Sequence, residues 1–166
     1  MRASVTAPMF LFVFALSAPR IHAQDMGIDV GKSPPSAIVQ RLDGKKVDLS
    51  NYIGKAPVLI EFWATWCPNC RELMPALLAA EKKYSGRVKF LAVAVNINQS
   101  PERVRKYLAA HPLPHETLWD ADGNAAGAFD APATSYVVVL NKKGIVAYTG
   151  LGGRQNLDAA IAKALK

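Results

Sequence analysis

The pattern of this 166-residue chain predicts a single α/β domain, with helices covering both faces of a mixed central sheet. Two observations carry this prediction. Buried apolar runs of strand length alternate with helical patterns through the middle of the chain, and strand pairs joined by turn residues stand on either side. The length also allows a core that is stable without disulfide braces.

The first half of the domain begins with a hairpin signal, because Asp43-Gly44 separates two short apolar segments. It continues with a buried strand, a helix that stops before Gly86 and a second buried strand. These four elements are expected at residues 37–49, 58–64, 71–84 and 88–95.

The second half starts with a helix, for which Ser100 is the expected N-cap and Pro101 the first residue. Next come a short strand, a turn with a short helix, a strand hairpin turning at residues 141–144, and an amphipathic helix. The first helix is expected to end near Ala110. The short strand is expected at residues 116–119, the turn with its short helix at 120–130, the hairpin at 135–149 and the last helix at 157–165, with a loop at 150–153.

The N-terminus has the composition of a secretory signal peptide. A basic start and an apolar core of about ten residues, too short for a span of ~20, precede Ala23. We therefore expect residues 1–23 to be a signal peptide or, if uncleaved, an N-terminal anchor. Residues 24–36 form a polar lead-in and residues 37–166 the domain. The protein is then extracytoplasmic, in the periplasm, and touches a membrane only if that segment is retained.

The net charge of +7 falls to +5 without residues 1–23, since Arg2 and Arg20 are the only charged residues there. The remaining charges are scattered and form no basic stripe with interleaved aromatic residues. This pattern does not predict nucleic-acid binding.

The chain contains only two cysteines, Cys67 and Cys70, and they lie where a buried strand gives way to a helix. Backbone N–H groups at a helix N-terminus favour a thiolate, which is the nucleophile in thiol–disulfide exchange. A disulfide between these two residues closes a very small loop, so it contributes little as a brace. The pair predicts dithiol–disulfide chemistry.

The segment Glu61-Phe-Trp-Ala-Thr-Trp-Cys-Pro-Asn-Cys70 resembles the strand-to-helix motif of thioredoxin-like proteins, and in particular the extracytoplasmic TlpA-type thiol–disulfide oxidoreductases, or redoxins. The resemblance covers about residues 31–166. It implies a thioredoxin-like fold: a four- or five-stranded core with an N-terminal β-hairpin and a central insertion. We expect a monomer that needs no cofactor beyond the cysteine pair.

The resemblance further implies protein thiol or disulfide substrates and an upstream redox partner. A reducing task is expected, such as keeping the cysteines of apocytochromes or copper sites reduced during cytochrome c maturation. Cys67 is expected to attack the substrate and Cys70, more buried, to resolve the mixed disulfide. Glu61 is expected to accept the proton of Cys70; pairing with a lysine or a position at a sheet edge is the alternative.

Four further residues are expected to contact substrate or to adjust the redox pair. Trp66 is expected to shield Cys67, and Pro68 and Asn69, between the cysteines, to set the reduction potential. Pro132 is the candidate for the family's cis-proline opposite the cysteines. Trp63 is expected to be a core residue.

One alternative function uses the same two cysteines to carry Cu(I), for which thiolates are suitable ligands. No further ligand is evident in the sequence. A zinc site, which takes about four ligands, is not expected either.

Overall fold

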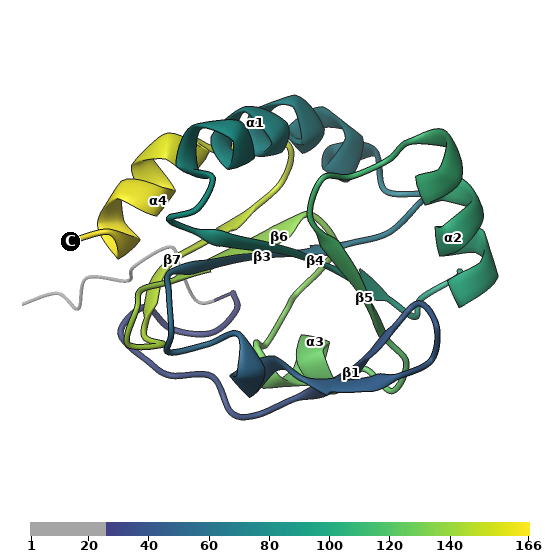
Figure 1. Ribbon diagram of the computed structural model, residues 1–166, viewed down its shortest axis with the longest axis horizontal. Helices are drawn as coiled ribbons and strands as arrows, with labels where there is room; N and C mark the ends of the chain where they lie inside the picture. Colours follow the sequence, from purple (N-terminus) through teal and green to yellow (C-terminus); the bar gives the residue numbers. More distant parts are fainter. Residues whose placement is uncertain (1–25) are drawn as a thin grey trace, which may run out of the picture.

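The computed structural model describes residues 26–166, which form an α/β sandwich around one mixed sheet (Figure 1). The sheet has seven strands in the order β2-β1-β5-β4-β3-β6-β7. The strands are β1 Ile38–Arg41, β2 Lys46–Asp48, β3 Val58–Trp63, β4 Lys89–Val95, β5 Glu116–Asp120, β6 Tyr136–Leu140 and β7 Val146–Leu151. The helices are α1 Pro68–Tyr84, α2 Pro101–Ala110, α3 Asn124–Ala128 and α4 Leu157–Ala164, with a 3-10 turn at Leu49–Asn51.

The centre of the sheet is parallel and its two sides are antiparallel. Strand β3 pairs in parallel with β4, which pairs in parallel with β5, whereas β3 pairs antiparallel with β6, and β6 with β7. The hairpin β1–β2 adds to this five-stranded core through β5. The expected mixed sheet with an N-terminal hairpin is confirmed.

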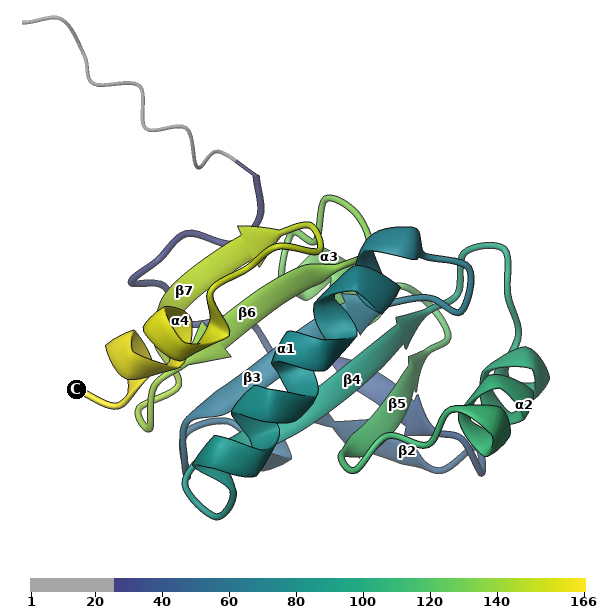
Figure 2. The same cartoon turned by 90° about the horizontal axis from the view of Figure 1, so that it is seen from above.

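Helices cover both faces of the sheet, as the sequence predicts. Helices α1 and α4 lie together on one face, and the view from above shows α1 crossing the central strands (Figure 2). Leu59 of β3 and Val139 of β6 point into this layer. Helices α2 and α3 contribute Val104 and Ala125 to the core on the other face.

The boundaries of two elements differ from the sequence expectation. Helix α1 begins at Pro68, three residues early, because Cys67 serves as the N-cap and proline is well suited to the first helical position. Strand β7 runs to Leu151, into the expected loop, because Leu151 pairs with Tyr136. The predicted start of α2 is confirmed: the Ser100 hydroxyl accepts from the backbone N–H of Arg103.

The part of the lead-in that the structure describes, residues 26–36, packs on the domain. Ile28 is buried, and its backbone N–H donates to the carbonyl of Phe129. The expected signal peptide or anchor at residues 1–23 lies outside the described residues. Among residues 26–166, no helix is both long enough and apolar enough to cross a bilayer.

Candidate redox site

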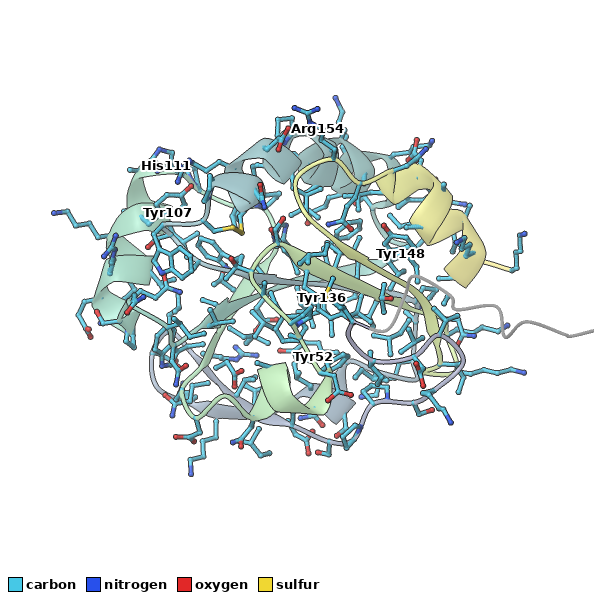
Figure 3. All side chains as sticks on the ribbon, turned by 180° about the vertical axis from the view of Figure 1, so that it is seen from behind. Tyr52, Tyr107, His111, Tyr136, Tyr148 and Arg154 are labelled. Carbon is cyan, nitrogen blue, oxygen red and sulfur yellow. A yellow bond between two sulfur atoms is a disulfide. The ribbon has the colours of Figure 1, made fainter. Side chains whose placement is uncertain are left out.

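The two cysteines form a disulfide at the N-terminus of α1. Cys67 is the N-cap residue, and its Sγ accepts a hydrogen bond of 3.0 Å from the backbone N–H of Cys70. The sulfur pair lies on the side of the molecule that carries Tyr107 and His111 (Figure 3). Helix N–H groups directed at Cys67 favour negative charge there, so reduction of the bond leaves a thiolate in a stabilising position.

The expected difference in burial between the cysteines is wrong for this disulfide state. Cys67 and Cys70 are each only 2% exposed. The neighbouring Pro68 and Asn69 are exposed, as is Trp66 at 36%. The buried disulfide is therefore flanked in the sequence by three exposed residues.

Trp66 is held beside the disulfide by a loop from elsewhere in the chain. Its indole Nε1 donates a hydrogen bond of 2.8 Å to the carbonyl oxygen of Ile97, in the loop after β4. Ile97 is itself 56% exposed. Trp63, by contrast, is fully buried and packs against Tyr107, as expected of a core residue.

Gln99 makes a second connection between the same loop and the segment before the cysteines. Its Oε1 accepts from the backbone N–H of Thr65 at 2.9 Å, and its Nε2 donates to the carbonyl of Val95 at 2.6 Å. The sequence analysis missed this residue. A glutamine in a polar loop has no distinguishing spacing, so only the tertiary contact reveals it.

Glu61 is the buried carboxylate of the site. Its side chain is 1% exposed, and neither carboxylate oxygen has a hydrogen-bond partner in the described structure. It pairs in register with Val137 of β6, which places it on the sheet face covered by α1, the helix that contains Cys70.

Both alternatives for Glu61 are wrong. No lysine pairs with it among residues 26–166, and β3 has hydrogen-bonded neighbours on both sides, so Glu61 is not at an edge. Burial disfavours the charged form and raises the pKa of Glu61 from 4.5 to about 8. Such a carboxyl group is mostly protonated at neutral pH and can exchange a proton close to that pH.

The expected cis-proline at Pro132 is wrong. No cis peptide bond occurs in residues 26–166, and Pro132 is exposed in the loop before β6. The residue that joins the end of β3 is Ser135, whose backbone N–H donates to the carbonyl of Phe62 at 2.8 Å. Two residues, Ala133 and Thr134, lie between Pro132 and this contact, so the proline precedes the strand pair.

Ser135 is a second residue that the sequence analysis missed. It is completely buried with a left-handed backbone, φ +63°, and its Oγ donates to the carbonyl of Gly152 at 3.1 Å. Serine at positive φ is strained. A local sequence pattern does not reveal a backbone conformation that a distant strand end imposes.

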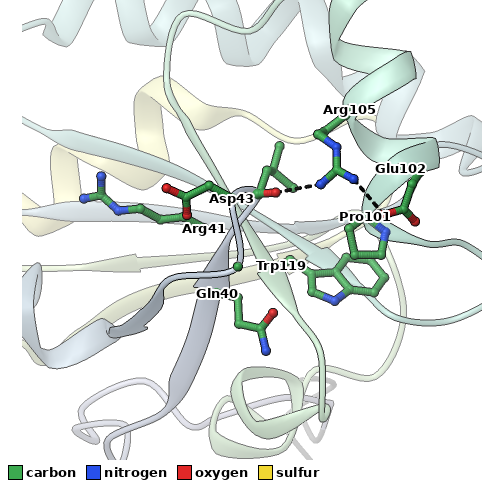
Figure 4. Close-up of a pocket in the computed structure, with 9 residues that line it drawn as sticks. Gln40, Arg41, Asp43, Pro101, Glu102, Arg105 and Trp119 are labelled. Atoms are coloured by element: carbon green, nitrogen blue, oxygen red, sulfur yellow. Dashed lines mark hydrogen bonds and ion pairs between the residues drawn. The ribbon is translucent and has the colours of Figure 1, made fainter.

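A separate pocket of about 480 Å³ lies between the β1–β2 turn and the start of α2 (Figure 4). Arg105 crosses it and donates to the carbonyl of Leu42 and to Glu102, so its guanidinium is already satisfied. Neither cysteine lines this pocket. In the described part of the chain, no three His, Cys, Asp or Glu side chains lie together in a way that could hold a metal ion.

A cysteine pair at the start of a helix, above a mixed sheet with a buried carboxylate, defines a thioredoxin-like thiol–disulfide oxidoreductase. In this class the cysteine pair itself carries the electrons. The family model for Redoxin matches residues 29–165, and the chain belongs to that family.

Curated relatives and solved structures agree with this assignment. The chain is 33% identical over 125 residues to the thioredoxin-like protein YneN of Bacillus subtilis, covering 74% of this chain and 72% of YneN. It is 25% identical over 126 residues to the thiol-disulfide oxidoreductase ResA of the same organism, covering 76% and 69% of the two chains.

Among solved structures, a Neisseria meningitidis protein assigned to the thioredoxins superposes with a TM-score of 0.68 at 31% identity, covering 81% of this chain and 90% of that one. StoA of Bacillus subtilis superposes with a TM-score of 0.63 at 22% identity, covering 77% and 96%. The likeness to StoA concerns the fold alone.

Proposed function

We propose that this protein reduces disulfides of protein substrates outside the cytoplasm, with Cys67 as the attacking thiol and Cys70 as the resolving thiol. The observation that carries the proposal is a helix-capping cysteine pair together with a partnerless buried carboxylate, Glu61, on the sheet face that the same helix covers. The names of relatives such as ResA, a thiol-disulfide oxidoreductase, support the same chemistry.

The reaction consists of two exchanges. The Cys67 thiolate attacks one sulfur of the substrate disulfide, forming a mixed disulfide and releasing the other substrate sulfur as a thiolate. Cys70 then loses its proton and attacks Cys67, which forms the Cys67–Cys70 bond and releases the second substrate sulfur. The substrate gains two electrons and the protein loses two, so an upstream dithiol must reduce the protein again.

Glu61 accepts the proton of Cys70 in the second exchange. Its position on the α1 face of the sheet and its pKa of about 8 favour this role, because a base whose pKa lies near the working pH transfers protons efficiently. Because its pKa is raised, the carboxyl group is mostly neutral near pH 7, and a neutral carboxyl group is less costly to bury than a carboxylate.

Substrate is expected to contact the exposed Trp66, Pro68 and Asn69, and we also propose a contact with Pro132, which is exposed in the loop before β6. We propose that residues 1–23 direct the domain to the periplasm, as a cleaved signal peptide or an anchor, and that it acts there as a monomer. A task in cytochrome c maturation fits a reducing direction of transfer.

The reduction potential of the Cys67–Cys70 pair, measured in thiol–disulfide buffers, tests the direction. The reduction potential of a reductase should be about −250 mV, in the range of thioredoxin. A value of about −130 mV, like that of a strong oxidant, would contradict the reducing role. The copper alternative is tested by titrating Cu(I) into the wild type and Cys70→Ser. A tight site in the wild type without disulfide exchange would favour the chaperone.

A further inference from the structure

An apolar groove of about 620 Å³ lies between α1 and the C-terminal end of α2. We call it the α1/α2 groove. Its apolar lining comes from two segments, namely Met74, Pro75 and Leu78 of α1, and Tyr107, Pro112 and Leu113 of α2 and the loop after it. Leu78 is 38% exposed, although the leucines on the other side of α1 are buried. The apolar lining of the α1/α2 groove is therefore partly open to solvent.

The groove starts one helical turn from the reactive sulfur. Cys67, Arg71, the pair Met74 and Pro75, and Leu78 follow one another at intervals of three or four residues, so they form one stripe along α1. Leu78 is eleven residues after Cys67, about 16 Å along the helix at 1.5 Å per residue. An extended peptide of roughly five residues spans that length at ~3.3 Å per residue.

The redox end of the groove carries a positive charge without a partner. Arg71 is exposed and has no ion pair with any described residue, whereas Arg154 pairs with Glu72, the residue after Arg71. At the other wall His111 stacks on Tyr107 with ring centroids 4.6 Å apart. The groove therefore combines an apolar floor with one cation close to the disulfide.

We propose that the α1/α2 groove binds an extended apolar segment of the protein substrate next to its reactive cysteine, with an acidic side chain facing Arg71. This inference rests on the proposed function. The mixed disulfide at Cys67 holds the substrate at the start of the groove, so its flanking residues contact the groove at a high effective concentration. Weak apolar contacts then contribute to selection among substrates.

The test uses Cys70→Ser, in which Cys67 forms a mixed disulfide that is not resolved. The probes are synthetic peptides whose single cysteine carries 5-thio-2-nitrobenzoate as a mixed disulfide. Attack of the Cys67 thiolate on the peptide sulfur forms the Cys67–peptide bond and releases the coloured thionitrobenzoate anion, which is measured. One peptide has leucines and an aspartate around the cysteine, a second has serines instead, and a third replaces the aspartate by lysine.

We expect the leucine–aspartate peptide to react about tenfold faster than the serine peptide, the change expected from burying about one apolar side chain. Adding Leu78→Ser should remove this advantage, whereas Leu165→Ser, at a leucine near the C-terminus that is 37% exposed and does not line the groove, should keep it. Arg71→Glu should reverse the preference between aspartate and lysine peptides. Arg87→Glu, in the turn after α1 ends at Tyr84, should not.

Reaction with the small disulfide 5,5′-dithiobis(2-nitrobenzoate) distinguishes a failure of the groove proposal from a failure of the proposed redox function. Equal rates for the peptides, or an advantage that survives Leu78→Ser, overturns the groove as a substrate site while the small disulfide still reacts. Failure of Cys67 to react even with the small disulfide instead contradicts the proposed function. Circular dichroism spectra of Leu78→Ser and Leu165→Ser serve as the control that both variants are folded.

Discussion

The side chain of Gln99 accepts a hydrogen bond of 2.9 Å from the backbone N–H of Thr65, two residues before the first cysteine. The same side chain donates to the carbonyl of Val95. One amide therefore joins the end of β4 to the segment that connects β3 with the redox helix. With the bond from Trp66 to Ile97, it fixes the loop on which the disulfide depends.

Replacing Gln99 with leucine should loosen this segment. The Thr65 N–H loses its partner in a nearly buried position, so we expect the free energy of unfolding in urea to fall by about 1–3 kcal/mol. The fluorescence of Trp66 should also change, because its neighbouring loop is no longer held. Gln40→Leu is the control, since Gln40 has no side-chain hydrogen bond in the described structure. Equal effects of the two substitutions would show that Gln99 does not hold the loop.

Glu61→Gln should slow the reduction of protein disulfides near neutral pH. Glutamine keeps the size of the side chain but accepts no proton from Cys70, so the resolving step should be roughly tenfold slower or more. In the wild type this step should accelerate as the pH rises through about 8, the pKa of Glu61, and the variant should lack that inflection. Stopped-flow rates that are identical for both proteins from pH 6 to 9 would rule out the proton-acceptor role.

Stability should respond to pH through the same residue. The pKa of Glu61 is raised to about 8 in the folded protein from 4.5, so between these values the folded state binds more protons than the unfolded state. The free energy of unfolding should therefore decrease as the pH rises from about 4.5 to about 8.

The contribution of Glu61 to the free energy of unfolding is fully present below pH 4.5 and is lost by about pH 8. Its size is on the order of 3–5 kcal/mol, at 1.4 kcal/mol per pKa unit. Urea titrations of the oxidised wild type and Glu61→Gln across this range measure it. Parallel curves would mean that Glu61 does not titrate in this window.

Ser135 allows backbone strain and side-chain bonding to be separated. Alanine loses the hydrogen bond to Gly152 and keeps the unfavourable φ, whereas glycine loses the bond and relieves the strain. We expect Ser135→Gly to be more stable than Ser135→Ala by about 1 kcal/mol in thermal or urea unfolding. An alanine variant that is as stable as the glycine variant would show that the left-handed conformation has no cost here.

Gly27 tests whether the lead-in is part of the folded domain. Its φ is +97°, and a Cβ there would collide with the hydroxyl of Tyr136, whereas Gly31 has a similar φ of +93° and open space around it. Gly27→Ala should therefore lower the free energy of unfolding by about 1–3 kcal/mol more than Gly31→Ala. If the two substitutions cost the same, the segment does not pack on Tyr136 in solution.

The sequence by itself determined the order of the elements and the position of the redox pair. Strand β3 and helix α2 were predicted within one residue, because a continuous apolar run and a Ser-Pro helix start are local signals. Cys67 and Cys70 were found in the same way, since the chemistry requires two thiols within one helical turn. Glu61 was found because a carboxylate within a buried run is conspicuous.

Tertiary structure alone decided which distant residues meet at the site. Gln99 and Ser135 take part because the end of β4 and the start of β6 lie beside the end of β3, and strand order is a long-range property of the sheet. For the same reason Pro132 was misjudged: its distance from β3 depends on where β6 begins to pair. Burial of the Glu61 side chain, which sets its pKa, also requires the packed helices, because desolvation arises only when the whole core is assembled.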